Sequence, residues 1–155
     1  MADYNFLTTW KFDAPLDKMY AVVYDTDTYH LWWRGQSKVE RLAGGDALGV
    51  GAVRRFRTRS VLPYTLEYTG TVLSVEPYKK VVGTAVGELE GTGTWYFDYD
   101  GQISTIKYHW VVKTNSWMMN MLSPFMRPVF EWNHNVVMRW GGEGLAKYIG
   151  CNLIK

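Results

Sequence analysis

Hydrophobic and polar residues alternate with a period of two over much of the first 114 residues, a pattern typical of β-strands with one buried face. The first such stretch is residues 6–12, where Phe6, Thr8, Trp10 and Phe12 fall on one face. Further strands are predicted at residues 37–42, 52–60, 66–76, 81–86, 91–99 and 103–113. Glycine, proline and aspartate separate them, and Asp100-Gly101 suits the tight turn of a hairpin.

Two short helices are expected between the first two strands. The first begins at Pro15, after an N-cap at Asp13 or Ala14, because proline lacks the N–H that the first helical turn leaves unpaired. The second runs from Tyr29 to Trp33 and stops before Gly35.

The period changes to that of a helix at Trp117, and Pro124 and Pro128 are expected to kink or restart this helix. Beyond Pro128 one face is broad and apolar. The order of elements predicts an α+β domain, in which the long C-terminal helix packs on one face of a curved antiparallel sheet of about seven strands. The apolar face is expected to carry Val129, Phe130, Val136, Val137, Trp140, Gly144 and Tyr148, and the polar face Glu131, Asn135, Arg139, Gly142 and Ala146.

Gly141, Gly142 and Gly144 lie together in this helix, where each glycine costs about 1 kcal/mol relative to alanine. Such a cost points to a packing requirement. We expect Gly141 and Gly144 to let the sheet or the first strand approach the helix closely.

A length of 155 residues fits one domain, residues 1–155. Aromatic residues make up 16% of the chain, so large rings either fill the core or border a pocket, and the sequence leaves both open. A net charge of +2 is too small for nucleic acid as the main partner. The one basic cluster puts Arg55, Arg57 and Arg59 on one side of a strand, which favours a solvated outer face.

Cys151 is the only cysteine and falls at a C-terminal end expected to fray, so no internal disulfide is possible. The sequence shows no secretory signal and no apolar run near 18 residues. We therefore expect a cytoplasmic protein without an integral membrane segment. The oligomeric state stays open.

Two polar residues interrupt the apolar face of the long helix: Asn133 at its middle and His134 on its flank. His134 is the candidate acid/base, since only imidazole titrates near neutral pH. Asn133 could hold an oxyanion, and Tyr64, Tyr68 or Tyr108 could donate to a carbonyl. Alternatively, Asn133 and His134 tie the helix to neighbouring backbone.

The sequence contains no motif for metal-dependent, cofactor-dependent or nucleophilic catalysis. His30, His109 and His134 are scattered, so neither a metal site nor a cofactor is expected, and His109 is expected on the solvated face of the sheet. The sequence also lacks the Gly-x-Ser-x-Gly nucleophile motif.

Several segments together resemble the polyketide cyclase/dehydrase-like branch of the START-like (SRPBCC) superfamily. They are Leu62-Pro63-Tyr64, the stretch 87–95, Trp110, and the run from Pro128 through Asn133-His134 and Met138 to Gly144-Leu145. The resemblance covers nearly the whole chain. It implies a helix-grip fold with a deep apolar cavity between the curved sheet and the helix. In this branch an acidic residue commonly follows the Asn-His pair. This chain has Asn135 at that position and so lacks a carboxylate to orient the imidazole, which weakens the case for a histidine-driven mechanism.

Three functions remain open: a protein that binds a hydrophobic polyketide, aromatic or lipid-like molecule, a cyclase or dehydratase that uses His134, and an interaction module with a filled core and exposed rings such as Tyr29 and Trp117. We favour the first. The residues expected to contact its ligand are Trp33, Phe56, Tyr64, Tyr68, Trp95, Tyr108, Trp110, Phe130, Asn133, His134 and Val137.

Overall fold

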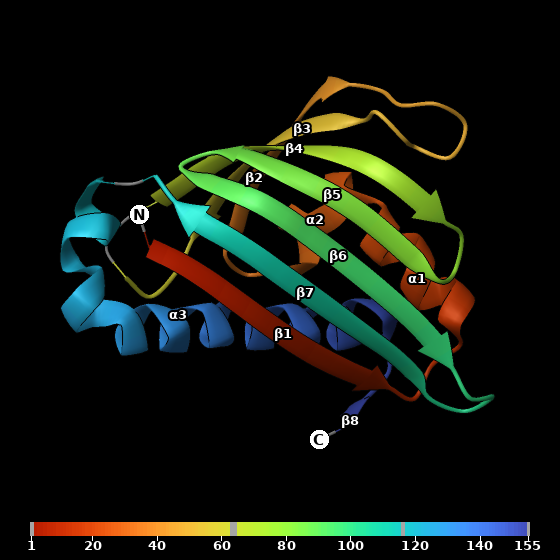
Figure 1. The fold of residues 1–155 in the computed structure, drawn as a ribbon. Coiled ribbons are helices and arrows are strands. Elements are labelled where there is room, and N and C mark those ends of the chain that lie inside the picture. Colours follow the sequence, from red (N-terminus) through yellow and green to blue (C-terminus); the bar gives the residue numbers. More distant parts are fainter. Residues whose placement is uncertain (1, 63–64, 116, 155) are drawn as a thin grey trace.

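The computed structural model describes residues 2–62, 65–115 and 117–154. One antiparallel sheet and one long helix dominate it (Figure 1). The strands are β1 (Ala2–Phe12), β2 (Gln36–Ala43), β3 (Val53–Arg59), β4 (Thr65–Glu76), β5 (Lys80–Gly87), β6 (Leu89–Tyr99), β7 (Ser104–Thr114) and β8 (Leu153–Ile154). The helices are α1 (Leu16–Tyr24), the 3-10 turn η1 (Thr26–Thr28), α2 (Tyr29–Trp32) and α3 (Trp117–Ile149).

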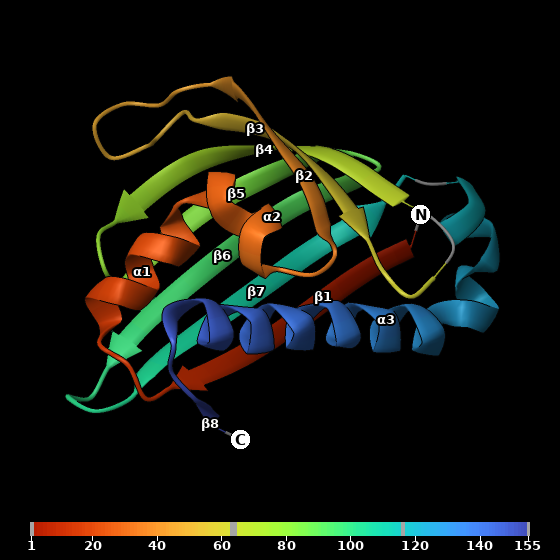
Figure 2. The same cartoon turned by 180° about the vertical axis from the view of Figure 1, so that it is seen from behind.

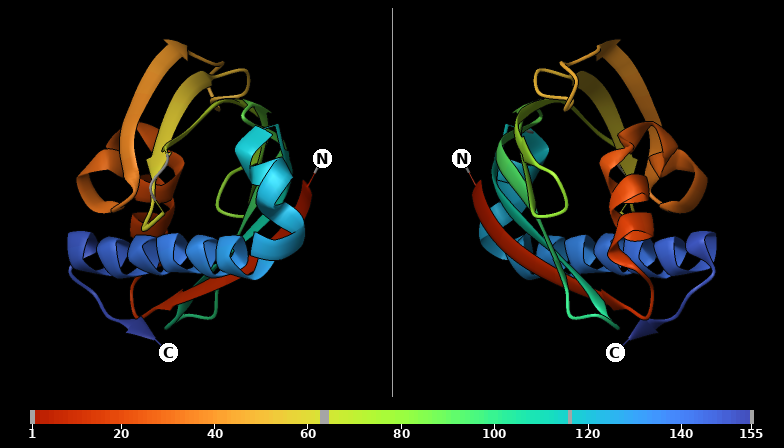
Figure 3. Two further views of the ribbon diagram at one scale, coloured as in Figure 1. Left: turned by 90° about the vertical axis from the view of Figure 1, so that its left-hand side faces the viewer. Right: turned by 90° about the vertical axis from the view of Figure 1, so that its right-hand side faces the viewer.

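The sheet has the strand order β2-β3-β4-β5-β6-β7-β1-β8. It curls around α3, and the two short helices lie on the same concave side (Figures 2 and 3). Alternation of side chains decides which residues face inward: in β1, Tyr4, Trp10 and Phe12 are buried, whereas Leu7 is exposed. The predicted α+β architecture, a curved sheet around the C-terminal helix, is confirmed.

The helices begin and end at slightly different residues from those expected. α1 starts at Leu16, and Pro15 occupies the N-cap position with extended backbone. α2 ends at Trp32, one residue early, and its Tyr29 is buried rather than exposed. Pro124 and Pro128 do not restart the C-terminal helix, because α3 is continuous over 33 residues. Its first turns nevertheless run in a different direction from the rest, so a bend is present (Figure 3).

The C-terminal end is ordered and adds an eighth strand that the sequence did not predict. β8 pairs with Lys11 and Phe12 of β1. Asn152 donates its backbone N–H and its side-chain amide to the carboxylate of Asp13, at 2.6 and 2.9 Å. The expectation of a frayed end at Cys151 is therefore wrong.

The buried face of α3 is rotated from the expected one. Gly142 and Ala146, placed on the polar side, are buried, and Tyr148, placed on the apolar side, is 48% exposed. Gly142 was misplaced because its close contact with Trp10 of β1, rather than hydrophobicity, puts it on the buried side. Tyr99, expected inside, is also exposed, because it lies at the open end of β6.

Candidate functional site

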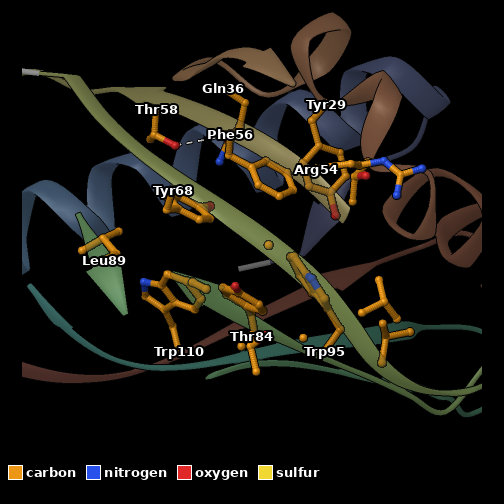
Figure 4. A pocket seen from close by; sticks show the side chains of 18 of the residues that line it. Tyr29, Gln36, Arg54, Phe56, Thr58, Tyr68, Thr84, Leu89, Trp95 and Trp110 are labelled. Atoms are coloured by element: carbon orange, nitrogen blue, oxygen red, sulfur yellow. Dashed lines mark hydrogen bonds between the residues drawn. The ribbon is translucent and has the colours of Figure 1, made fainter. Parts of the chain in front are cut away.

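A cavity of about 440 Å³ lies between the concave face of the sheet and α3 (Figure 4). Its volume falls within the usual range for small-molecule sites. Small residues at inward positions of the central strands contribute to this space. Gly83 and Ala85 line it, whereas Gly70 and Gly93, which also line it, leave room for the rings of Phe56, Tyr108 and Trp110. At Gly83, an added Cβ would come within 4 Å only of the Thr71 backbone. The sheet is therefore hollowed at its middle.

Aromatic rings form a continuous wall on the sheet side of the cavity. Trp95 of β6 lies opposite Tyr108 of β7, with ring centroids 4.2 Å apart. Tyr108 stacks with Trp110 at 5.7 Å, and Trp110 lies 5.8 Å from Tyr68. Tyr68 in turn stacks on Phe56 of β3 at 5.2 Å (Figure 4). The wall thus crosses from the middle of the sheet to its far strands.

The structure brings the residues predicted to bind a ligand together. Ten of the eleven line the cavity, and that they contact a ligand stays a prediction. Tyr64 lies outside the described residues. The ten are Trp33, Phe56, Tyr68, Trp95, Tyr108, Trp110, Phe130, Asn133, His134 and Val137.

Two tryptophans fix α3 at the edge of the cavity. Trp33 Nε1 donates to the carbonyl of Val137 at 2.9 Å, and Trp10 Nε1 donates to that of Met138 at 3.1 Å. Gly141 and Gly142 lie one turn further along the helix, and a Cβ on Gly141 would stand 2.6 Å from the Trp33 ring. The absence of side chains at these glycines opens the two carbonyls to the indole rings.

Gly144 allows an even closer approach. A Cβ at this position would overlap the carbonyl oxygen of Trp32, at the end of α2. The prediction that Gly141 and Gly144 permit close packing is confirmed, although Gly144 admits the backbone of α2 rather than the sheet.

An ion pair that the sequence analysis missed lies at the α1–η1 end of the cavity. Arg54 of β3 donates Nε to Asp27 Oδ1 at 2.8 Å and Nη2 to Asp27 Oδ2 at 3.3 Å. The Arg54 side chain is only 16% exposed. Its bond to Asp27 holds the carboxyl pKa below its usual value and raises that of the guanidinium. Arg54 alternates along β3 with Phe56 and Thr58 and therefore lies on the same face of the strand as these two residues. That alternation was the available sequence signal for an inward-facing Arg54.

Three tyrosines around the cavity stay neutral. Tyr29 donates its hydroxyl to the Val23 carbonyl at 2.6 Å. Burial raises the pKa of Tyr68 to about 12 and also raises the pKa values of Tyr29 and Tyr108. Their hydroxyls therefore act as neutral hydrogen-bonding groups at physiological pH.

Asn133 and His134 form a polar point on the α3 side of the cavity. Asn133 is 8% exposed, and its Oδ1 has no hydrogen-bond partner among the described residues. His134 stacks on Phe6, with centroids 3.9 Å apart and planes at 11°, and its Nδ1 also lacks a partner there. Neither of these two atoms ties the helix to neighbouring backbone.

Burial lowers the pKa of His134 to about 4, against an opposing interaction with the Asn135 side chain. The imidazole is therefore neutral at pH 7. It is therefore a weak base, and it lacks the imidazolium proton that a general acid would transfer.

We expect the free energy of unfolding to fall by about 3 kcal/mol as the pH drops from 6.5 to 4. The unfolded chain binds a proton to this imidazole below about pH 6.5, whereas the folded protein binds it only near pH 4, so acid favours unfolding. Urea titrations at several pH values measure this slope. His134→Phe, which keeps a ring against Phe6, should flatten the profile in this window; an unchanged slope would assign it to other groups.

Metal ligands do not gather among the described residues, where no group of three or more His, Cys, Asp or Glu side chains could hold an ion. His109 lies on the outer face as expected, with Nε2 2.8 Å from Asn5 Oδ1. None of the helices in the described ranges is both long and apolar enough to cross a membrane.

The family model for "Polyketide cyclase / dehydrase and lipid transport" matches residues 12–135, most of the chain. The chain belongs to this family. The resemblance seen in the sequence is thereby confirmed. No curated protein matches the sequence significantly.

Solved structures share the fold of this family member. The Zhui aromatase/cyclase from Streptomyces sp. R1128 superimposes with a TM-score of 0.77 at 15% identity, over 96% of this chain and 94% of that one. The di-domain aromatase/cyclase BexL of the BE-7585A biosynthetic pathway gives 0.64 at 17% identity, over 92% of this chain but 50% of BexL. Norcoclaurine synthase from Thalictrum flavum, in complex with dopamine and hydroxybenzaldehyde, gives 0.57 at 16%, over 96% and 87%. The helix-grip fold is confirmed.

Proposed function

We propose that the protein binds a hydrophobic, ring-bearing small molecule of polyketide-like or related aromatic or lipid-like character in the cavity between the sheet and α3. The observation that carries this proposal is the unfilled volume of about 440 Å³ beside a continuous wall of five rings, Trp95, Tyr108, Trp110, Tyr68 and Phe56. Aromatic faces favour planar ligands, which gain from stacking beyond their buried area. A filled core, as an interaction module requires, would leave no such space.

Arg54 supports a ligand that carries oxygen. A guanidinium has five N–H donors, and Asp27 accepts from Nε and from one on Nη2. The remaining donors suit a carbonyl or an enolate at this end of the cavity. Polyketide-like molecules offer such groups, and the family description and the Zhui aromatase/cyclase are consistent with this class.

Catalysis as a cyclase or dehydratase is the second candidate, and its support is the same family description. It would rest on orientation of the ligand by the ring wall and on Arg54. His134 contributes at most as a weak base near pH 7, because its pKa lies at about 4. For this reason we rank binding before catalysis.

Tryptophan fluorescence tests the proposal with 2-methylanthraquinone, a planar quencher. We expect saturable 1:1 quenching, because Trp33, Trp95 and Trp110 line the cavity. Trp110→Phe should reduce the quenching amplitude. Trp132→Phe is the matched control, since Trp132 is exposed on α3 and should leave the bound fraction unchanged. Linear quenching without saturation would contradict the proposal.

A further inference from the structure

The α3 side of the cavity holds a buried hydrogen-bond acceptor without a donor. Asn133 Oδ1 has no partner among the described residues, and its neighbours on the cavity-facing side of the helix, Phe130 and Val137, offer only hydrocarbon. An unsatisfied buried polar atom carries the full cost of its lost hydration. Such an atom beside an open cavity is suited to a group supplied from within that cavity.

A second polar atom lies at the same end of the cavity. His134 Nδ1 is buried and likewise without a partner, and stacking against Phe6 fixes its ring. The imidazole is neutral at physiological pH because burial lowers its pKa. Depending on its tautomer, Nδ1 can then either accept or donate a hydrogen bond.

The surrounding charges restrict the donor that this end can receive. The acidic residues that line the cavity, Asp25 and Asp46, belong to the start of η1 and to the loop between β2 and β3. The Asn133 end lies instead beside Phe130, which packs in the cluster of Tyr4, Leu89 and Trp110. An ammonium group buried there would have no counter-charge, which is costly. A neutral donor is favoured.

We propose that the ligand carries a hydroxyl group, an alcohol or a phenol, that donates to Asn133 Oδ1 and has His134 Nδ1 as its second polar neighbour. A hydroxyl both donates and accepts, so it suits either tautomer of the imidazole. This inference rests on the proposed function, since it names the chemistry of the ligand in the same cavity. It also orients the ligand, with the hydroxyl toward α3 and its carbonyl oxygens toward Arg54.

Three anthraquinones that differ at one substituent test the inference by calorimetry. 2-Hydroxyanthraquinone offers a donor, 2-methoxyanthraquinone only an acceptor, and 2-methylanthraquinone neither. We expect the hydroxy compound to bind wild-type protein roughly 10-fold more tightly than the other two, as one buried hydrogen bond predicts. Asn133→Leu should reduce this preference to about 2-fold or less, with little change for the methyl compound.

Gln102→Leu is the control, because Gln102 is an exposed amide in the turn between β6 and β7 and does not line the cavity. It should keep the preference for the hydroxy compound. Equal affinity of the three compounds for wild-type protein would overturn the inference yet leave the proposed function standing. Absence of binding by all three compounds would contradict both the inference and the proposed function. Because the wild-type series decides the question alone, failure of Asn133→Leu to fold would not protect the inference.

Discussion

Replacing Gly144 with leucine should lower the free energy of unfolding by about 3 kcal/mol or more, or prevent folding. Intrinsic helix propensity predicts the opposite sign, since leucine exceeds glycine by almost 1 kcal/mol in a helix. Packing decides the outcome, because a Cβ at this position would overlap the carbonyl oxygen of Trp32. Backbone on both sides leaves little freedom to relax. Chemical denaturation followed by circular dichroism measures the change.

Lys147→Leu provides the control for this experiment. Lys147 lies three residues further along α3 and is exposed, so the same new side chain meets solvent there. Its stability should stay within about 0.5 kcal/mol of the wild type. A melting temperature for Gly144→Leu equal to or above that of the wild type would show that α2 does not approach the helix as described.

Replacing Gly83 with isoleucine should weaken binding of 2-hydroxyanthraquinone by about 100-fold, close to 3 kcal/mol, while the protein stays folded. Gly83 lies at the hollow of the sheet, and a Cβ there would meet only the Thr71 backbone, at 3.3 Å or more. The side chain would therefore extend into the space proposed for the ligand. A β-branched residue suits a strand better than glycine, which offsets the tight contact of its Cβ with the Thr71 carbonyl oxygen, so the change in stability should be small.

Val86→Ile controls for the added bulk on the same strand. Val86 is exposed on the convex side of β5, and its enlargement leaves the cavity unchanged. It should bind the probe like the wild type. Undiminished affinity of Gly83→Ile would mean that the ligand binds elsewhere. The proposed binding site between the sheet and α3 would then be wrong.

Strand periodicity made most of the fold predictable. Residues 37–42 and 81–86 fall within β2 and β5, the strand expected at 103–113 begins one residue later as β7, and the turn at Asp100-Gly101 joins β6 to β7. These predictions held because alternation reports directly which face is buried. β8 was not predictable in this way, since two residues are too few to show a period. Its position depends instead on the contact of Asn152 with Asp13, 139 residues apart in the sequence.

Helix faces were less predictable where small residues determine the packing. Gly142 reads as neutral in a hydrophobic pattern, yet a Cβ on it would stand 3.0 Å from the Trp10 ring. The approach of that ring is a tertiary feature, and no local signal around residue 142 contains it. The glycine cluster itself was the useful signal, because its energetic cost demanded a packing partner.

The site was predictable where ring-bearing positions lie on inward faces of strands, as for Tyr68, Trp95 and Trp110. Arg54 was missed because attention to the neighbouring arginines favoured a solvated face. Its pairing with Asp27 spans two elements, and only the fold shows that η1 lies against β3. A charged residue at an inward position of a predicted strand was the available indication of a buried ion pair.

The pairing of the first strand sets the order in which this protein can mature during synthesis. β1 hydrogen-bonds to β7 and β8, and the Trp10 indole reaches Met138, 128 residues further along the chain. The ribosome must therefore release at least the residues as far as Met138 before all of these partners of β1 are available. Until then that face is available to chaperones and to other nascent chains, and folding waits for long-range contacts.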